Sequence, residues 1–405
     1  MAGRKDSGVL QKFGHGHIDT LGLASVLFVY VVAGAFLAFP TRLAKSAQTA
    51  AWTVPIFSGV LCALWLAPLV YVHPRYPGKT IVEITRDLAG KAVAAIFGVF
   101  FFVANTGMVC SIARQLCETL TTVVVPLTPI TFTLTVVCAT GIYLALKGTE
   151  ILSRLSIIIT VATILNVTLS SALTYHAWHI DDIYPLLGPG LPDLAKSYFI
   201  GQTMYLELMA LGILAPYLRK RSSLGKATLA GTVLSMVMLS LVTLTCLMMF
   251  PYPSLTRVHL PFLRTVRIIY LSRFLQRFDA VFVVLWLSAG TLFVAIGAWI
   301  NSHLIASLTG LGAYRIGVLI SGVLILAGAF LPSNIAEAIS VHSTVIRTYS
   351  LLLLYPWSYT LLVLQLMREK KRKTVGGSGT GREPHGARAG ASGDATTRGG
   401  GGEEA

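Results

Sequence analysis

Residues 20–40 read TLGLASVLFVYVVAGAFLAFP, an apolar run without a charged side chain. Such a run of about 20 residues is long enough to cross the hydrocarbon core of a membrane as a helix. Backbone groups in lipid must be paired within their own segment, so this run and the similar runs after it are expected to be helical. The run ends in Pro40 and Arg42 rather than in a small-residue cleavage site. It therefore predicts a permanent first span of an all-α membrane protein.

The composition of the whole chain points the same way. Of its 405 residues, 54% are hydrophobic and 12% are charged, whereas soluble domains carry about 25% charged residues. The net charge of +15 raises the possibility of nucleic acid as a partner. Most Lys and Arg residues stand at the ends of apolar runs, however, as the positive-inside rule expects. The charge therefore indicates membrane orientation, and the lipid bilayer rather than nucleic acid is the expected surrounding.

About ten apolar runs are candidate membrane spans. They cover Thr20–Pro40, Ala51–Val72, Ala92–Leu116, Ile130–Leu146, Ile151–Tyr175, Tyr198–Leu218, Leu224–Phe250, Ala280–Leu304, Ile316–Leu331 and Ser343–Met367. We expect residues 1–17 to form a cytoplasmic N-terminus and residues 18–368 a permease-like transmembrane domain. Residues 369–405 are predicted to be a disordered cytoplasmic tail, because a sequence rich in Gly, Ala, Ser and Thr cannot bury a core.

The connecting segments predict the topology. With ten spans and both termini in the cytoplasm, most basic connections fall on the cytoplasmic side. The segment Pro251–Asp279 is the main exception, because it carries five arginines and is counted as external. Its apolar residues recur at helical spacing, which is typical of an amphipathic helix at the membrane interface. A shorter amphipathic segment, Thr80–Leu88, is expected on the cytoplasmic side.

Two of the candidate spans have an irregular composition. The first contains Gly34 six residues before Pro40, and the sixth contains the sequence GQTMYLE at residues 201–207, followed by Gly212 and Pro216. Irregularities in the first span of each five-span half are typical of an inverted repeat whose discontinuous helices meet near the membrane midplane. The sequence thus predicts a five-plus-five inverted repeat with discontinuous helices 1 and 6.

Two longer stretches resemble one family. Residues 76–84, YPGKTIVEI, and residues 273–286, RFLQRFDAVFVVLW, resemble the segment after span 2 and the entry into span 8 of spore germination permeases. The resemblance runs from about Ile18 to Met367. It implies the fold of the amino acid/polyamine/organocation transporter superfamily and the role of the membrane-embedded subunit of an endospore germinant receptor. Ala33 and Ala35 depart from this pattern, because many relatives have glycine there.

Glu207 is the acidic residue near the middle of a predicted span. A charge at that depth costs about 2.5–3.5 kcal/mol on insertion scales, so it should face a cavity or a partner. One interpretation is a site for a ligand ammonium group or a proton. The other is a protonated side chain that bonds to the backbone of span 1. The two interpretations are not exclusive.

The remaining candidate ligand-binding residues surround the same two irregular spans. Gly34 and Ala35 could present backbone N–H groups to an anion, and Thr203, Met204 and Tyr205 could shape a pocket beside Glu207. Close helix packing is the alternative for each of them.

Other polar residues are expected to be structural. Asn105 is predicted to form hydrogen bonds between helices. Arg114 with Glu118 and Arg277 with Asp279 are predicted to form local pairs.

No grouping of residues predicts catalysis, a metal site or a cofactor, and the protein is not expected to be an enzyme. The five cysteines lie in apolar stretches and are expected to be small buried residues.

The resemblance implies a subunit that binds a small germinant, an amino acid in our first interpretation, in a cavity between spans 1, 3, 6 and 8. Two other receptor subunits would be its partners, in the inner membrane of the endospore. A proton-coupled amino acid transporter, with Glu207 carrying the proton, is the alternative function.

Overall fold

The computed structural model describes residues 16–35, 39–269, 278–310, 312–332 and 346–377. The chain forms two compact units, Met1–Leu364 and Gln365–Ala405. The described part of the second unit is the end of one helix, in which the Gln365 amide donates to the Glu369 carboxylate at 2.8 Å. The rest of the description concerns the first unit.

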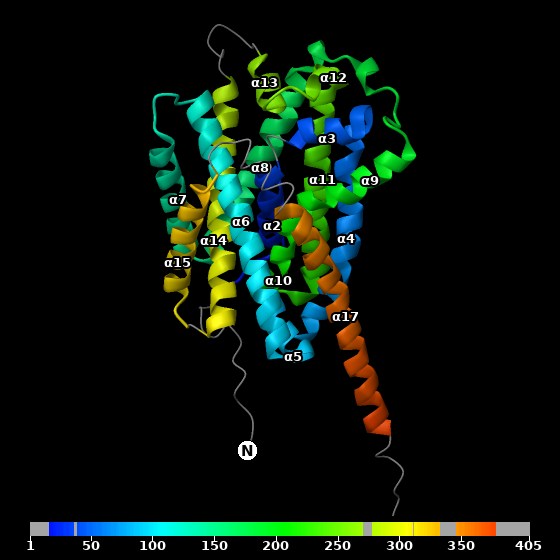
Figure 1. Ribbon diagram of the computed structural model, residues 1–405, viewed down its shortest axis with the longest axis vertical. Coiled ribbons are helices and arrows are strands. Elements are labelled where there is room, and N and C mark those ends of the chain that lie inside the picture. Colours follow the sequence, from blue (N-terminus) through cyan, green and yellow to red (C-terminus); the bar gives the residue numbers. More distant parts are fainter. Residues whose placement is uncertain (1–15, 36–38, 270–277, 311, 333–345, 378–405) are drawn as a thin grey trace, which may run out of the picture. The chain divides into compact units, whose positions relative to one another are not determined.

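The described residues of the first unit are almost entirely helical (Figure 1). Among the described residues, seven helical segments are long and apolar enough to span a membrane, and α2, α7 and α15 are shorter apolar helices. The main helices are α2 (Thr20–Ala35), α4 (Val54–Val72), α6 (Lys91–Val123), α7 (Ile130–Leu146), α8 (Thr149–Leu173), α9 (Leu191–Gly201), α11 (Leu224–Met249), α14 (Phe278–Thr309), α15 (Tyr314–Ala329) and α17 (Arg347–Gly377). Each predicted span overlaps one of these helices, although α6, α9, α14 and α17 begin or end several residues outside the predicted limits and residues 343–345 lie outside the described residues.

Span 1 is divided. Helix α2 ends at Ala35, and α3 (Phe39–Ala47) follows, with a short 3₁₀ helix, η1 (Gln48–Thr53), leading into α4. Almost every side chain of α2 is buried, as expected of a helix that is apolar on all sides. It packs against α8, α11 and α14 and lies inside the bundle (Figure 1).

Span 6 is irregular in a different way. After α9, the residues Gln202–Ala210 form a 3₁₀ helix, η5, before α10 (Leu211–Leu214) and the short η6 (Ala215–Tyr217). All nine residues of η5 are buried, and η5 packs against α2. Since 3₁₀ runs longer than three or four residues are uncommon, the middle of span 6 departs from ordinary helical geometry, as predicted.

The starts and ends of these two spans are joined. The backbone N–H of Ile18 donates to the carbonyl of Tyr217 at 2.9 Å, and the N–H of Arg219 donates to the carbonyl of Ile18 at 2.9 Å. These bonds form an isolated parallel bridge between Ile18 and Leu218. The beginning of span 1 and the end of span 6 are therefore fastened to each other.

Short helices lie at the two ends of the bundle. Helix α5 (Ile81–Ala89) begins with a capping box between Thr80 and Glu83, which confirms the predicted helix after span 2. At the opposite end (Figure 1), the segment with five arginines contains α12 (Tyr252–Leu255) and α13 (Pro261–Arg267). The apolar residues Leu263, Val266 and Ile269 are buried in the protein. The amphipathic face of α13 therefore packs on the bundle.

One of the two predicted structural pairs can be compared with the structure. Arg114 Nε lies 2.9 Å from Glu118 Oε2, as predicted. Asp279 lies 3.4 Å from Arg267 Nε, so α13 supplies it with a partner, and Arg277 lies outside the described residues.

Candidate functional site

The two irregular spans meet at a buried ion pair. Arg347, in the first turn of α17, places Nη2 2.5 Å from Oε1 of Glu207 in η5. The side chains of Arg347 and Glu207 are 3% and 0% exposed. A charge this deeply buried is stable only with a partner and further hydrogen bonds. Glu207 thus faces a partner, one of the two possibilities expected from its position.

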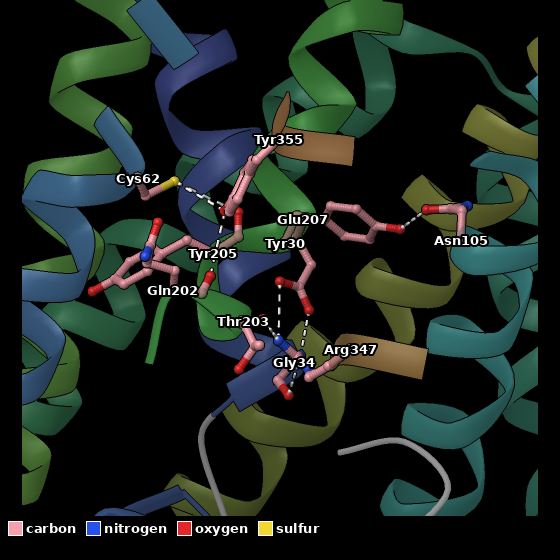
Figure 2. A network of polar contacts seen from close by, with 10 residues as sticks. All are labelled: Tyr30, Gly34, Cys62, Asn105, Gln202, Thr203, Tyr205, Glu207, Arg347 and Tyr355. Carbon is pink, nitrogen blue, oxygen red and sulfur yellow. Dashed lines mark hydrogen bonds and ion pairs between the residues drawn. The ribbon is translucent and has the colours of Figure 1, made fainter. Parts of the chain in front are cut away.

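Arg347 also bonds to the backbone of both irregular spans. Its Nη2 donates to the carbonyl of Gly34 at 3.3 Å, and its Nη1 donates to the carbonyl of Thr203. Figure 2 shows the guanidinium between Gly34, Thr203 and the Glu207 carboxylate. We refer to these four residues as the charged cluster. One arginine of span 10 therefore holds span 1 and span 6 together.

The absence of a side chain at Gly34 permits this close approach. A Cβ atom at Gly34 would lie 2.7 Å from Glu207 Oε1 and 3.1 Å from Phe293 Cε2, both closer than ordinary van der Waals contact. The ring of Phe293 in turn packs on Tyr30, with centroids 4.5 Å apart. In this conformation the position between spans 1, 6 and 8 is filled by side chains.

A second, uncharged cluster lies one helical turn earlier on α2. The hydroxyl of Tyr30 donates to Oδ1 of Asn105 in α6 at 2.7 Å (Figure 2). The Asn105 amide donates to the Gly297 carbonyl and to Oδ1 of Asn301 in α14. The Asn301 amide donates to hydroxyl groups of α6 and α15, those of Thr106 and Ser321. We refer to Tyr30, Asn105, Asn301, Thr106 and Ser321 as the neutral cluster.

The neutral cluster confirms the prediction for Asn105. The carboxamides of Asn105 and Asn301 each accept a hydrogen bond at the oxygen and donate two from the nitrogen. Together they link α2, α6, α14 and α15. The role of Asn105 is hydrogen bonding between helices.

The predicted site residues fall into two groups. Gly34, Thr203 and Glu207 meet at Arg347. Ala35 and Met204 are their buried neighbours, while Tyr205 turns toward α4 and donates its hydroxyl to the carbonyl of Pro55 at 2.7 Å. Figure 2 shows Tyr205 beside Cys62 and Tyr355, away from the ion pair.

Arg347 is the residue that the sequence analysis missed. In the predicted ten-span topology, it stands near the external start of the tenth span. An arginine there is on the wrong side for the positive-inside rule, and this anomaly was the available signal. The anomaly does not identify a partner, because the residues that Arg347 contacts are more than 100 positions away.

The described residues contain no group of three or more His, Cys, Asp or Glu side chains placed to hold a metal ion. The five cysteines are buried and free, as predicted, and Cys62 Sγ lies 3.1 Å from the hydroxyl of Tyr355.

Comparison with known structures identifies the fold. The chain is similar to Mhp1, a nucleobase-cation-symport-1 family transporter solved in a closed conformation with bromovinylhydantoin bound. The TM-score is 0.64 at 12% identity, and the match covers 89% of this chain and 80% of Mhp1. At this identity the likeness is one of fold. It confirms the predicted five-plus-five inverted repeat with discontinuous helices 1 and 6 in a multi-pass membrane protein.

Sequence comparison identifies the family. Residues 17–337 match the family described as spore germination protein. Spore germination protein KB of Bacillus subtilis (strain 168) is 23% identical over 339 residues, which are 80% of this chain and 88% of that protein. Spore germination protein A2 of the same organism is 21% identical over 273 residues, 67% of this chain and 74% of that protein. The chain belongs to the spore germination protein family.

Proposed function

We propose that this chain is the germinant-binding subunit of an endospore nutrient receptor in the inner membrane of the spore. It binds a small molecule, an amino acid in this proposal, and triggers germination together with two partner subunits. The observation that carries the proposal is the buried Glu207–Arg347 pair. In a chain of the spore germination family, Arg347 of this pair bonds to the backbone of both central spans.

The chemistry of the pair favours a zwitterion as the ligand. Glu207 offers an anion and Arg347 offers a cation that can bind a carboxylate through two N–H groups. The ammonium and carboxylate of one amino acid complement both. Because the protein already buries both charges, such a ligand exchanges one ion pair for two and adds no new unpaired charge.

The position of the pair connects ligand binding to conformation. Arg347 belongs to span 10 but bonds to Gly34 of span 1 and Thr203 of span 6. A ligand that binds Arg347 competes with these carbonyl groups and releases span 10 from spans 1 and 6. Its differential affinity for the released state then shifts the conformational equilibrium, which the partner subunits sense.

The test uses the neutral double variant Glu207→Gln/Arg347→Met. Neutralising both partners avoids an unpaired buried charge, so the subunit should still accumulate in spore membranes, as measured by immunoblot. Spores are exposed to each standard amino acid in turn, and germination rate is recorded against concentration. The response should require roughly ten- to a hundredfold more germinant, since a charged hydrogen bond contributes about 1.5–3 kcal/mol.

A matched control is available in α6. The double variant Arg114→Met/Glu118→Gln neutralises a pair of similar geometry, 2.9 Å apart, away from the charged cluster, and should leave the dose curve unchanged. Normal accumulation of the Glu207/Arg347 variant with an unchanged dose curve would reject the proposed site.

A proton-coupled amino acid transporter is the second candidate, and the transporter fold favours it. Purified protein in liposomes distinguishes the two, with a labelled amino acid outside and an imposed pH gradient. Binding without accumulation inside the liposomes is expected for the receptor. Accumulation that follows the proton gradient and is lost in Glu207→Gln would establish transport.

The proposed topology, with both termini in the cytoplasm, has its own test. One reporter is fused after Lys373 and another is inserted within residues 176–197, between spans 5 and 6. The two reporters should lie on opposite sides of the membrane. Finding both on the same side would overturn the ten-span arrangement.

A further inference from the structure

One face of α13 is exposed and basic. Residues 251–269, which contain α12 and α13, carry Arg257, Arg264 and Arg267 and no Asp or Glu. The apolar side chains of α13 are buried against the bundle, so the other side of the helix is exposed. Arg264, Arg267 and Ile268 are exposed together there, because residues three and four positions apart are neighbours on a helix. We refer to Arg257, Arg264, Arg267 and Ile268 as the basic face.

Contacts with α14 place the basic face at the end of a membrane span. The rings of Phe262 in α13 and Phe282 in α14 have centroids 5.6 Å apart, and Arg267 Nε lies 3.4 Å from Asp279 Oδ2. Asp279 begins a helical segment, Asp279–Thr309, that is long and apolar enough to cross a membrane. Figure 1 shows α13 at the end of the bundle opposite α5. The ends of a span meet the headgroup region of the bilayer, so the basic face lies at that depth.

Exposed apolar side chains accompany the arginines. Ile268 is 55% exposed, and Val281 near the start of α14 is 51% exposed. Arginines next to exposed apolar residues are typical of helices that lie in the membrane interface. A phospholipid complements both features, because its phosphate binds arginine through paired N–H groups and its acyl chains cover apolar side chains. An acidic protein segment would complement the arginines alone.

We propose that the basic face binds the headgroup of an anionic phospholipid. The arginines contact the phosphate, and an acyl chain lies beside Ile268. The hydroxyl of Thr41 in α3 donates to the carbonyl of Val258, just before α13, at 2.8 Å. Lipid bound at the basic face therefore fastens both α3, which follows the break in span 1, and the start of α14 to one leaflet. This site is independent of the proposed function at Glu207 and Arg347.

The experiment places a fluorescent bimane label on Ile268→Cys in the whole purified protein in phosphatidylcholine nanodiscs. The five native cysteines are buried, so the label attaches at position 268, and the native chain is the blank for labelling. A small, equal fraction of phosphatidylglycerol or phosphatidylcholine then carries a nitroxide quencher at the same acyl carbon. The phosphatidylglycerol probe should quench the label about fivefold more strongly for each arginine that attracts it.

Arg257→Gln/Arg264→Gln should bring the quenching by the two probes close to equality, whereas Arg267 is kept because it pairs with Asp279. The matched control, Lys220→Gln/Arg221→Gln, removes the same charge before α11 begins and should leave the preference unchanged. Thermal unfolding of each variant verifies that it is folded.

Salt gives a second measurement that needs no charge substitution. At about 1 M ionic strength the screening length falls to about 3 Å, so the preference for phosphatidylglycerol should largely disappear. Equal quenching by the two probes at low salt would overturn the proposal and favour an acidic protein segment as the occupant. A preference that survives Arg257→Gln/Arg264→Gln, or that the control variant also abolishes, would overturn it as well.

Discussion

The charged and neutral clusters lie one turn apart on α2 but are built differently. Around Tyr30, side chains bond mainly to other side chains, and the two carboxamides use every donor. Around Gly34, one arginine bonds to a carboxylate and to two backbone carbonyls. The neutral cluster joins helices that are regular at that point. The charged cluster joins the end of α2 to the 3₁₀ helix η5, so it alone includes residues with irregular backbone.

The largest effect is expected when the charged cluster loses one partner. Arg347→Met leaves the Glu207 carboxylate buried without its cation, which should reduce the free energy of unfolding by about 3–5 kcal/mol. Chemical unfolding of the purified protein in detergent measures it. Adding Glu207→Gln should recover most of the loss. If the Arg347→Met variant were as stable as the native protein, the pair would not be holding the spans together.

The next largest effect on the free energy of unfolding is expected from the neutral cluster, where one substitution removes several hydrogen bonds. Asn105→Leu removes the partner of the Tyr30 hydroxyl and of Asn301 Oδ1, and each buried group left unpaired costs about 1–3 kcal/mol. The same unfolding measurement applies. At equal protein level, however, the germination dose curve should stay that of the native chain. A shifted curve would mean that the two clusters are not functionally distinct.

A single methyl group tests the packing between the clusters. Gly34→Ala places a Cβ atom 2.7 Å from Glu207 Oε1, and overpacking of this kind costs about 1–3 kcal/mol. The free energy of unfolding and the germinant dose curve should both change in this variant. Gly312→Ala is the control, because a Cβ atom there meets nothing within 4 Å. Equal behaviour of the two variants would argue against a requirement for glycine at position 34.

The smallest effect is expected from one hydroxyl group. Tyr30→Phe removes the hydrogen bond to Asn105 but keeps the ring against Phe293, so the loss should be about 0.5–1.5 kcal/mol. Tyr205→Phe removes a bond of the same length to the Pro55 carbonyl and gives a matched comparison. The two carboxamides are assigned most of the stability of the neutral cluster. If Tyr30→Phe lowered the free energy of unfolding as much as Asn105→Leu does, this assignment would be contradicted.

The spans and their irregular members were predictable because both depend on local properties of the chain. Apolar length identifies each helix, and Gly34 and the sequence around Glu207 mark the irregular points. The need of Glu207 for a partner followed from the cost of burying a charge. The identity of that partner did not, because it depends on how α17 packs across spans 1 and 6. The orientation of Tyr205 toward α4 also could not be predicted from the local sequence. Its neighbour Thr203 contacts Arg347 through its backbone, so nearby residues of η5 make different contacts.

The 3₁₀ geometry of η5 has a consequence for distance and direction within span 6. Its nine residues extend roughly 18 Å as a 3₁₀ helix and roughly 13.5 Å as an α-helix, from rises of about 2.0 and 1.5 Å per residue. The same change of winding turns one end against the other by roughly half a revolution. Because the Ile18–Leu218 bridge fastens the far end of the span to the start of span 1, rewinding η5 would pull and rotate both central spans at once.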